Sequence, residues 1–433
     1  MSQRERPGRG VPERFKILGL TFACFAISYL DRLNLSVAAP AIMQERGLDE
    51  AQMGAILAAF FWGFAVAHPI GGWLADRYGG KRVLAAGAAW WSLWTLLTPF
   101  AAASLLPARV MLGLGEGVNT PAMHSMFGRW FPPEERTRAV AFNLSGIQIG
   151  TIVAFPLSTW ILLRFGWRAI FYAYAAVGLV WVAAWWRVAR DHPEDAAAAN
   201  AAGAGPPASA HREPTPWRAL LRSRAVWAIL LCTCCTNWVA FLFFTWLPTY
   251  LVKSQGFSLK AMGFYATLPY VAAIVLGNAA GLLADRLIRR GVDPTRVRKS
   301  FFVVGMSAAA LLLYALRAPH EPLVVVALLT LTQGAFAVGG STIAVNSIDV
   351  APRHAGTMTG LQGLLGNVAG GFSPWVAGEI VARTGSWENV FLAAAAVAAL
   401  GVVVYAVLGS GRPIDLAASP APDAARAAAG GAG

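Results

Sequence analysis

Long apolar runs alternate with short polar and charged segments along most of this chain. We predict a helix over each of twelve runs, in two sets of six. The first set covers residues 15–43, 53–74, 83–103, 105–127, 139–163 and 168–186, and the second covers 226–252, 260–283, 300–317, 322–348, 357–382 and 387–408. Most runs approach or exceed the roughly 20 residues that a helix needs to cross a bilayer. The pattern therefore predicts an all-α polytopic membrane protein with twelve transmembrane helices.

The composition agrees with this class and excludes a single soluble domain. Hydrophobic residues make up 57% of the chain and charged residues 13%, whereas about a quarter of the residues in soluble domains are charged. The net charge of +13 could suggest nucleic acid, but the basic residues are unevenly placed. The loops opposite the termini carry only Arg46, Arg164, Arg168, Lys253, Lys260, Arg317 and Arg383. By the positive-inside rule, we expect cytoplasmic termini, an inner (plasma) membrane location and no nucleic-acid partner.

A polar stretch rich in Ala, Gly and Pro separates the two sets of helices. Such a composition cannot bury a packed core, so we interpret residues 187–225 as a cytoplasmic linker. The predicted halves are then residues 15–186 and 226–408. Residues 1–14 form a cytoplasmic tail, and we expect residues 409–433 to form a disordered cytoplasmic tail for the same compositional reason.

The two halves share a sequence motif. GGWLADRYGGKR (71–82) follows the second predicted helix, and GLLADRLIRRG (281–291) follows the eighth. Asp76 and Arg77 thus correspond to Asp285 and Arg286. A repeat in the same orientation after six spans indicates pseudo-symmetric halves related by an axis along the membrane normal. Substrate is then expected near the bilayer midplane, between the halves.

Four charged residues fall at membrane depth in the first half. Asp31 and Arg32 are adjacent in the first predicted helix, while Arg109 and Glu116 lie seven residues apart in the fourth. Seven helical steps of about 100° return nearly to the starting direction, so Arg109 and Glu116 share a face. Charges at this depth are costly and normally mark a functional path. Two cations with two carboxylates suggest anion binding coupled to protons.

Adjacent helical residues point about 100° apart, so Asp31 and Arg32 are not expected to pair with each other. Our hypothesis is that Asp31 pairs with Arg109, and Arg32 with Glu116 when no substrate is bound. A guanidinium stays charged when buried and binds a carboxylate through two parallel hydrogen bonds. The alternatives are a purely structural ion pair for Arg32 and a permanently ionised anchor for Glu116.

The loop G-x-L-A-D-R-Y-G-G-K-R, its weaker second copy and the twelve predicted spans together resemble the major facilitator superfamily over essentially the whole ordered chain. The resemblance implies that Asp76, Arg77, Asp285 and Arg286 form a latch on the cytoplasmic side. The second copy lacks the glycine after Asp-Arg and has LIRRG instead, which suggests a looser latch in that half.

YLDRLNLSVAAPAI (29–42) and RVMLGLGEGVNTPAMHSMFGRWFPPEERTRA (109–139) resemble the anion:cation symporter family, whose members carry sugar acids, hexuronates, aromatic acids, sialic acid or glutamate. This resemblance implies that Arg32 binds the substrate carboxylate. Asp31 and Glu116 would then be the proton-linked acids, with Arg109 as their charge partner.

Other candidate substrate contacts are neutral. By resemblance we favour Gln148 and Asn367, with Tyr29 as an aromatic lining residue, although such polar residues are individually as suited to holding helices together. The chain departs from the family at Phe64, where relatives usually have tyrosine, and at His68, where they have glutamine. Phe64 removes a hydroxyl that would bind a polyol, which favours a less hydroxylated acid.

The leading hypothesis is a proton-coupled symporter that imports a small organic anion by alternating access, such as a sugar acid, an aromatic acid or a dicarboxylic acid. An anion exchanger or exporter would need the arginines but no proton-carrying Glu116. A transporter-like sensor would signal through residues 187–224, which show no periodic or charged docking surface. We expect no enzyme, metal or cofactor, because no nucleophile–base or metal spacing occurs in the sequence. The expected partners are the anion, protons and lipid, and we expect a monomer.

Overall fold

The computed structural model describes residues 13–101, 104–131, 133–191, 217–351, 355–412 and 414. Within them the secondary structure is helical, and no strand occurs. Most of the predicted N-terminal tail, the middle of the 187–225 linker and nearly all of the predicted C-terminal tail lie outside the described residues.

The chain divides into two compact units. Unit 1 comprises residues 1–207 and 244–267, and unit 2 comprises residues 208–243 and 268–433. The segment Phe244–Thr267 therefore clusters with the first unit, although its sequence belongs to the predicted second half. One long helix, α10, contributes its first part to unit 2 and its last part to unit 1.

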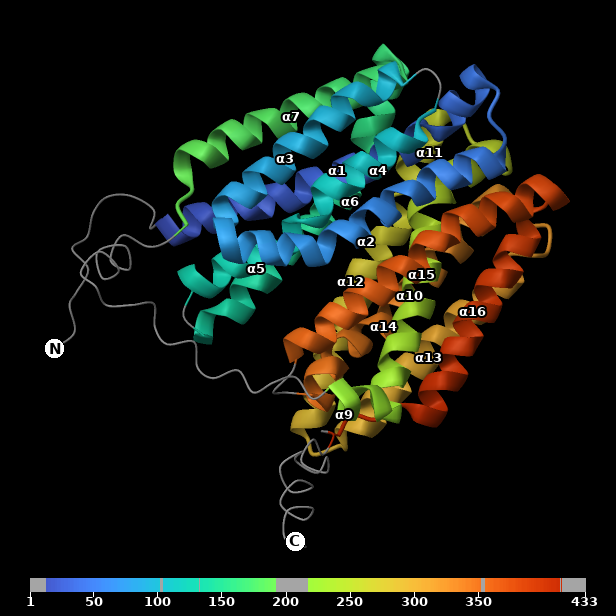
Figure 1. The fold of residues 1–433 in the computed structure, drawn as a ribbon. Helices are drawn as coiled ribbons and strands as arrows, with labels where there is room; N and C mark the ends of the chain where they lie inside the picture. The colour runs from blue at the N-terminus through green and yellow to red at the C-terminus, as the bar shows by residue number, and fades with distance from the viewer. Residues whose placement is uncertain are drawn as a thin grey trace, which may run out of the picture. The chain divides into compact units, whose positions relative to one another are not determined.

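The described helices largely cover the predicted ranges, and one short helix, α9, lies within the predicted linker (Figure 1). Unit 1 contains α1 (Glu13–Arg46), α2 (Glu50–Tyr78), α3 (Gly80–Leu97), a 3-10 turn (Thr98–Phe100), α4 (Leu106–Gly117), α5 (Asn119–Trp130), α6 (Pro133–Phe165), α7 (Trp167–Val188) and α11 (Leu259–Tyr265). Unit 2 contains α9 (Trp217–Arg222), α12 (Leu268–Arg289), α13 (Pro294–Ala315), α14 (Pro322–Val350), α15 (Ala355–Thr384) and α16 (Trp387–Leu408). The shared helix α10 runs from Arg224 to Lys253.

Two predicted helices are each broken in two, which corrects the sequence-based expectation. The range 105–127 becomes α4 and α5, separated at Val118, and the range 260–283 becomes α11 and α12. Pro121 and Pro269 explain the breaks, because a proline has no N–H to donate to the carbonyl four residues earlier. The first break lies directly after Glu116 and Gly117.

The helix packing repeats the sequence duplication inside each unit. In unit 1, α2 packs on α4 and α3 on α7, while in unit 2, α12 packs on α14 and α13 on α16. Glycines allow the close crossings: a Cβ on Gly146 of α6 would lie 2.5 Å from the carbonyl oxygen of Phe22 on α1. On α15, a Cβ on Gly370 would lie 2.6 Å from the ring of Phe241 on α10. Close packing at a glycine thus occurs in both the α1–α6 pair and the α10–α15 pair.

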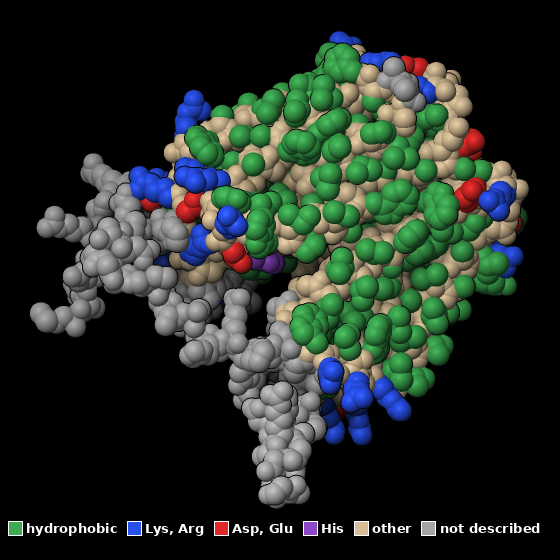
Figure 2. Space-filling model, in the orientation of Figure 1, with side chains coloured by type: hydrophobic (Ala, Val, Ile, Leu, Met, Phe, Trp, Pro, Cys, Tyr) green, Lys and Arg blue, Asp and Glu red, His purple; other side chains and the backbone are tan. Residues whose placement is uncertain are grey.

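Apolar side chains cover most of the visible surface of both units (Figure 2). Residues such as Val180, Leu311 and Val407 are 70% or 71% exposed. Such exposure of large apolar residues is typical of a lipid-facing surface. Among the described residues, nine helical segments are long and apolar enough to cross a membrane. The helices α1, α4, α5 and α15 are not among these nine, and α4 and α5 have only 12 residues each.

Candidate functional site

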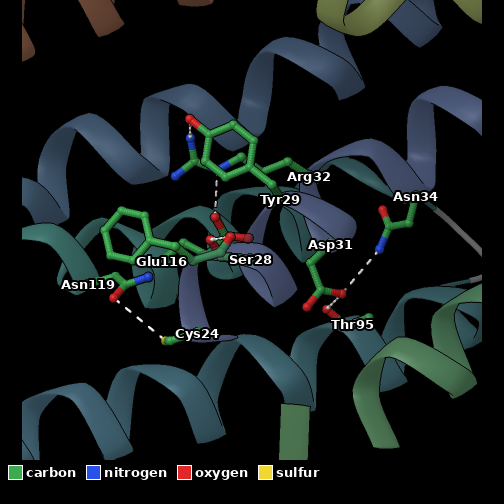
Figure 3. Close-up of polar contacts among 10 residues, drawn as sticks. Cys24, Ser28, Tyr29, Asp31, Arg32, Asn34, Thr95, Glu116 and Asn119 are labelled. Carbon is green, nitrogen blue, oxygen red and sulfur yellow. Dashed lines mark hydrogen bonds and ion pairs between the residues drawn. The ribbon is translucent and has the colours of Figure 1, made fainter. Parts of the chain in front are cut away.

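An ion pair between α1 and α4 forms the centre of the site. The Nε of Arg32 donates to Oε2 of Glu116 at 2.7 Å (Figure 3). The Glu116 side chain is fully buried, whereas that of Arg32 is 12% exposed. The expected pairing of Arg32 with Glu116 is confirmed. Because Nε carries this contact, the two terminal nitrogens of the guanidinium remain for other partners.

Aromatic rings enclose the guanidinium of Arg32. Its Cζ lies 4.6 Å from the ring centroid of Tyr29, 4.5 Å from that of Phe64 and 5.2 Å from that of Phe60. Nη1 donates to the Tyr29 hydroxyl at 3.3 Å, and among the described residues Nη2 makes no hydrogen bond. Cation–π contacts of this kind hold a guanidinium without neutralising it. Arg32 is therefore oriented by its surroundings and keeps hydrogen-bond donors free.

Glycines on α4 allow the helix segment that carries Glu116 to pack closely against α2. A Cβ on Gly113 would lie 2.0 Å from the carbonyl oxygen of Phe60, and one on Gly117 would lie 2.6 Å from that of Phe64. No larger residue fits at either position unless the helices separate. The close approach of α4 to α2 brings Glu116 beside the same rings that enclose Arg32. The glycines before and after Glu116 in the sequence thus allow a tight helix crossing.

Asp31 points away from Arg32, toward α3. Its Oδ1 accepts hydrogen bonds from the Thr95 hydroxyl at 3.2 Å and from the Asn34 amide at 3.4 Å (Figure 3). All three side chains are fully buried. The other carboxylate oxygen of Asp31 has no hydrogen-bond partner among the described residues.

The expected ion pair between Asp31 and Arg109 is absent from the described residues, which corrects that hypothesis. Arg109 is 2% exposed, and its guanidinium lies 5.1 Å from the ring centroid of Phe60. Its Nε and Nη1 have no hydrogen-bond partner there. The physical reason is that Thr95 and Asn34 satisfy one oxygen of Asp31 locally, while the Arg109 guanidinium lies over Phe60. The two charges share one buried region without direct contact.

The remaining predicted substrate contacts lie on other helices. Tyr29 contacts Arg32 directly and meets Phe244 edge-on, with ring centroids 5.8 Å apart. Gln148 is exposed on α6 in unit 1. Asn367 is half-buried on α15 in unit 2, where its amide donates to the carbonyl of Gly363 at 2.6 Å. Only Tyr29 is therefore joined to Arg32 by a contact, and the roles of Gln148 and Asn367 stay predictions.

The predicted latch residues lie at helix ends. Asp76 accepts a hydrogen bond from the Ser125 hydroxyl of α5 at 3.4 Å. The guanidinium of Arg77 lies 5.5 Å from the ring centroids of both Trp73 and Tyr78. Asp285 and Arg286 are exposed near the end of α12. Their role as a gate stays a prediction.

Sequence reasoning missed several residues that shape the site. Thr95 and Asn34 bind Asp31, and Phe60 covers both Arg32 and Arg109. Asn34 could have been found, because it lies three residues after Asp31 and so shares its helix face. Thr95 and Phe60 come from other helices, and no local pattern indicates which face of α1 they meet.

Comparison with known proteins now identifies the family. The sequence model of the Major Facilitator Superfamily matches residues 21–374. The chain belongs to this superfamily. It is therefore a membrane transporter and not an enzyme.

The solved structures with the same fold include a bacterial homologue of the human lysosomal transporter Spinster, with a TM-score of 0.76, 18% identity, and coverage of 92% of this chain and 97% of that one. Another is the D-xylose–proton symporter, with a TM-score of 0.72, 15% identity, and coverage of 92% and 99%.

Curated relatives extend over nearly the whole chain. A probable chloroplastic anion transporter of Oryza sativa subsp. japonica is 36% identical, with 93% of this chain and 70% of the relative covered. The chloroplastic ascorbate transporter of Arabidopsis thaliana is 35% identical, with 93% and 76% covered. A probable sulfoacetate transporter of Cupriavidus necator is 31% identical, with 91% and 93% covered.

Proposed function

We propose that this transporter is a proton-coupled symporter that imports a small organic anion by alternating access. The observation that carries the proposal is the state of Arg32: it is nearly buried, oriented by three aromatic rings, and bound to Glu116 through Nε alone. A carboxylate can approach the open edge of the guanidinium through two parallel hydrogen bonds. The names of the relatives, which refer to anions, ascorbate and sulfoacetate, support an anionic substrate.

Glu116 is the proposed coupling acid. One of its oxygens binds Arg32, while the other is buried and has no hydrogen-bond partner among the described residues. When a substrate carboxylate binds Arg32, it competes with Glu116 for the same positive charge. A proton on Glu116 removes that competition, so anion and proton binding support each other. Asp31, which lies close by with one free oxygen, is the second proposed proton-linked acid.

The surroundings of Arg32 favour a small acid with few hydroxyl groups. The rings of Phe60 and Phe64 offer no hydrogen bond, and Tyr29 supplies the one hydroxyl that contacts the guanidinium. A polyol bound there would lose hydrogen bonds to water without replacing them, which costs free energy. We therefore place sparsely hydroxylated carboxylates ahead of sugar acids.

For orientation, we propose that both termini are cytoplasmic in the inner (plasma) membrane of the cell. The support is the uneven distribution of Lys and Arg between the two sets of loops. Single cysteines introduced at Arg187 and Arg383 test it. An impermeant thiol reagent applied from outside should label the second and not the first; the reverse result contradicts the orientation.

The test of function is uptake into proteoliposomes under an imposed pH gradient. Candidate anions are first selected by thermal shift of the purified protein with aromatic acids, dicarboxylates, sugar acids and sulfonates. The expected result is accumulation of a labelled acid only when the outside is more acidic. Uptake that requires an internal anion and ignores the pH gradient would instead identify an exchanger. Absence of any transport of the stabilising acids would contradict the proposed function.

A further inference from the structure

A groove on the surface of unit 1 lies apart from the Arg32 site. It is formed by α2, α3 and α4, has a volume of about 480 Å³ and is almost entirely apolar. Its lining consists of Leu74, Tyr78, Arg82, Val83, Ala86, Gly87, Trp90, Leu114, Gly115 and Val118. Tyr78 and Trp90 are 48% and 43% exposed, so the groove opens to the surface of the unit.

Glycines let α3 and α4 pack closely together beside this groove. A Cβ on Gly87 would lie 2.5 Å from a methyl carbon of Val118, and one on Gly115 would lie 2.8 Å from the indole of Trp90. The indole N–H of Trp90 donates to the carbonyl of Met111 at 2.8 Å, which fixes the ring. The groove is thus bordered by two closely packed helices and by the Trp90 ring, which the hydrogen bond holds in place.

Arg82 supplies the charge at one end of the groove. It is exposed and makes no ion pair or hydrogen bond with any residue that the structure describes. Its basic neighbours are engaged, since Arg77 lies over Trp73 and Lys81 lies 5.2 Å from the ring centroid of Trp186. Asp191 lies near the start of α3, where its carboxylate accepts a hydrogen bond from the Lys81 backbone N–H at 2.7 Å. Arg82 therefore presents an uncompensated guanidinium beside an apolar channel.

The dimensions fit one hydrocarbon chain. Arg82 and Trp90 are eight residues apart on α3, which is about 12 Å along a helix axis. One leaflet of the hydrocarbon core is about 15 Å deep, half of the bilayer core. Arg82 and Tyr78 lie where α2 ends and α3 begins, the position at which Arg and Tyr side chains meet lipid headgroups. A packed helix about 10 Å in diameter would not enter a groove of this volume.

We propose that this groove binds one anionic phospholipid, with an acyl chain between α2, α3 and α4 and the phosphate group on Arg82. The Tyr78 hydroxyl, for which the described residues supply no hydrogen-bond partner, donates to the same headgroup. The acyl chain contacts Leu114 and Val118, which lie on either side of Glu116 in the sequence. The lipid therefore packs against the segment that carries the proposed coupling acid.

Native mass spectrometry of the purified full chain tests the site. The protein is delipidated in mild detergent and titrated with phosphatidylglycerol or, separately, phosphatidylcholine. Arg82→Gln removes the charge, and Ala86→Trp fills the groove while leaving Arg82 in place. Arg187→Gln and Ala183→Trp are matched controls, because both residues are exposed on α7 and neither lines the groove. Size-exclusion profiles and melting temperatures without added lipid establish that each variant is folded.

We expect one tightly held phosphatidylglycerol per wild-type chain and weaker binding of phosphatidylcholine. Arg82→Gln should weaken phosphatidylglycerol binding roughly fivefold, the value for one basic residue near an anionic headgroup. Ala86→Trp should abolish the tight site, and both controls should retain it. Equal losses in Arg82→Gln and Arg187→Gln would overturn the proposal and indicate general surface attraction. An unchanged lipid count in folded Ala86→Trp, or equal binding of both lipids, would overturn it as well.

Discussion

Arg32 and Glu116 lie 84 residues apart in the sequence, yet the Nε of the first binds the buried carboxylate of the second at 2.7 Å. The contact joins α1 to α4, and α2 supplies the rings that cover it. One edge of the guanidinium thus contacts the carboxylate of Glu116, and we propose that the substrate anion binds the other edge. The predictions on transport below depend on this division.

Glu116→Gln should abolish proton-driven accumulation while exchange of labelled for unlabelled substrate continues. Glutamine resembles the protonated acid in shape but cannot release a proton, so the empty carrier cannot reset after symport. Uptake under a pH gradient and counterflow are measured in the same proteoliposomes, with Asp31→Asn in parallel. Retained accumulation would reject Glu116 as the coupling acid and move that role to Asp31. Loss of both activities would support the purely structural ion pair.

Arg32→Lys should weaken substrate binding almost as much as Arg32→Ala. A lysine keeps the charge but loses the planar donors that match a carboxylate and the stacking on Tyr29 and Phe64. Loss of a hydrogen bond to a charged group costs about 1.5–3 kcal/mol, so affinity should fall roughly tenfold to hundredfold. Isothermal titration measures it, with Arg187→Lys as the control at an exposed position. Wild-type affinity in the lysine variant would show that Arg32 is only a counter-charge.

Phe64→Tyr should shift the substrate preference toward hydroxylated acids. The Phe64 ring centroid lies 4.5 Å from the Arg32 guanidinium, so a hydroxyl on this ring would be near a carboxylate bound there. One added hydrogen bond contributes about 0.5–1.5 kcal/mol. The measurement is the ratio of affinities for a sugar acid and for an unhydroxylated acid of similar size. The idea fails if that ratio stays at its wild-type value in a correctly folded variant.

A reducible bis-methanethiosulfonate cross-link between cysteines introduced at Glu50 and Lys253 should stop transport. Lys253 at the end of α10 pairs with Glu50 at the start of α2 at 2.8 Å. Lys253 belongs to the second sequence half although it packs in unit 1, and we expect alternating access to separate it from Glu50 in each cycle. The same reagent on cysteines at positions 45 and 168 is the control, because Glu45 and Arg168 form an ion pair within the first half. Transport should continue in that control, and reduction should restore it in the Glu50–Lys253 variant.

Glu45→Gln should lower stability near neutral pH and have no effect in strong acid. Hydrogen bonds from Arg168 and then Trp167 lower the pKa of Glu45 from 4.5 to about 2. Because the folded pKa is lower than the unfolded one, the stabilisation is present above about pH 4.5 and is lost as the pH falls toward 2. Melting temperatures across this range measure the difference between wild type and variant. Glu388→Gln is the control, since Glu388 has no ion pair among the described residues; a constant difference for Glu45→Gln would contradict the linkage.

The sequence by itself determined the helical membrane class, the duplicated motif and the four charges at membrane depth. These follow from local composition and spacing, because a helix must satisfy its own backbone in lipid and every intramembrane charge is conspicuous against an apolar background.

Only the tertiary structure decided which of these residues meet. Asp31 binds Thr95 and Asn34 in place of Arg109, and Phe60 lies over both arginines. The rotation of each helix about its axis selects these partners, and that rotation is set by packing against several neighbours at once. The groove beside Arg82 arises in the same way, because its lining residues come from three helices. No single stretch of sequence contains that information, because each contact joins segments that only folding brings together.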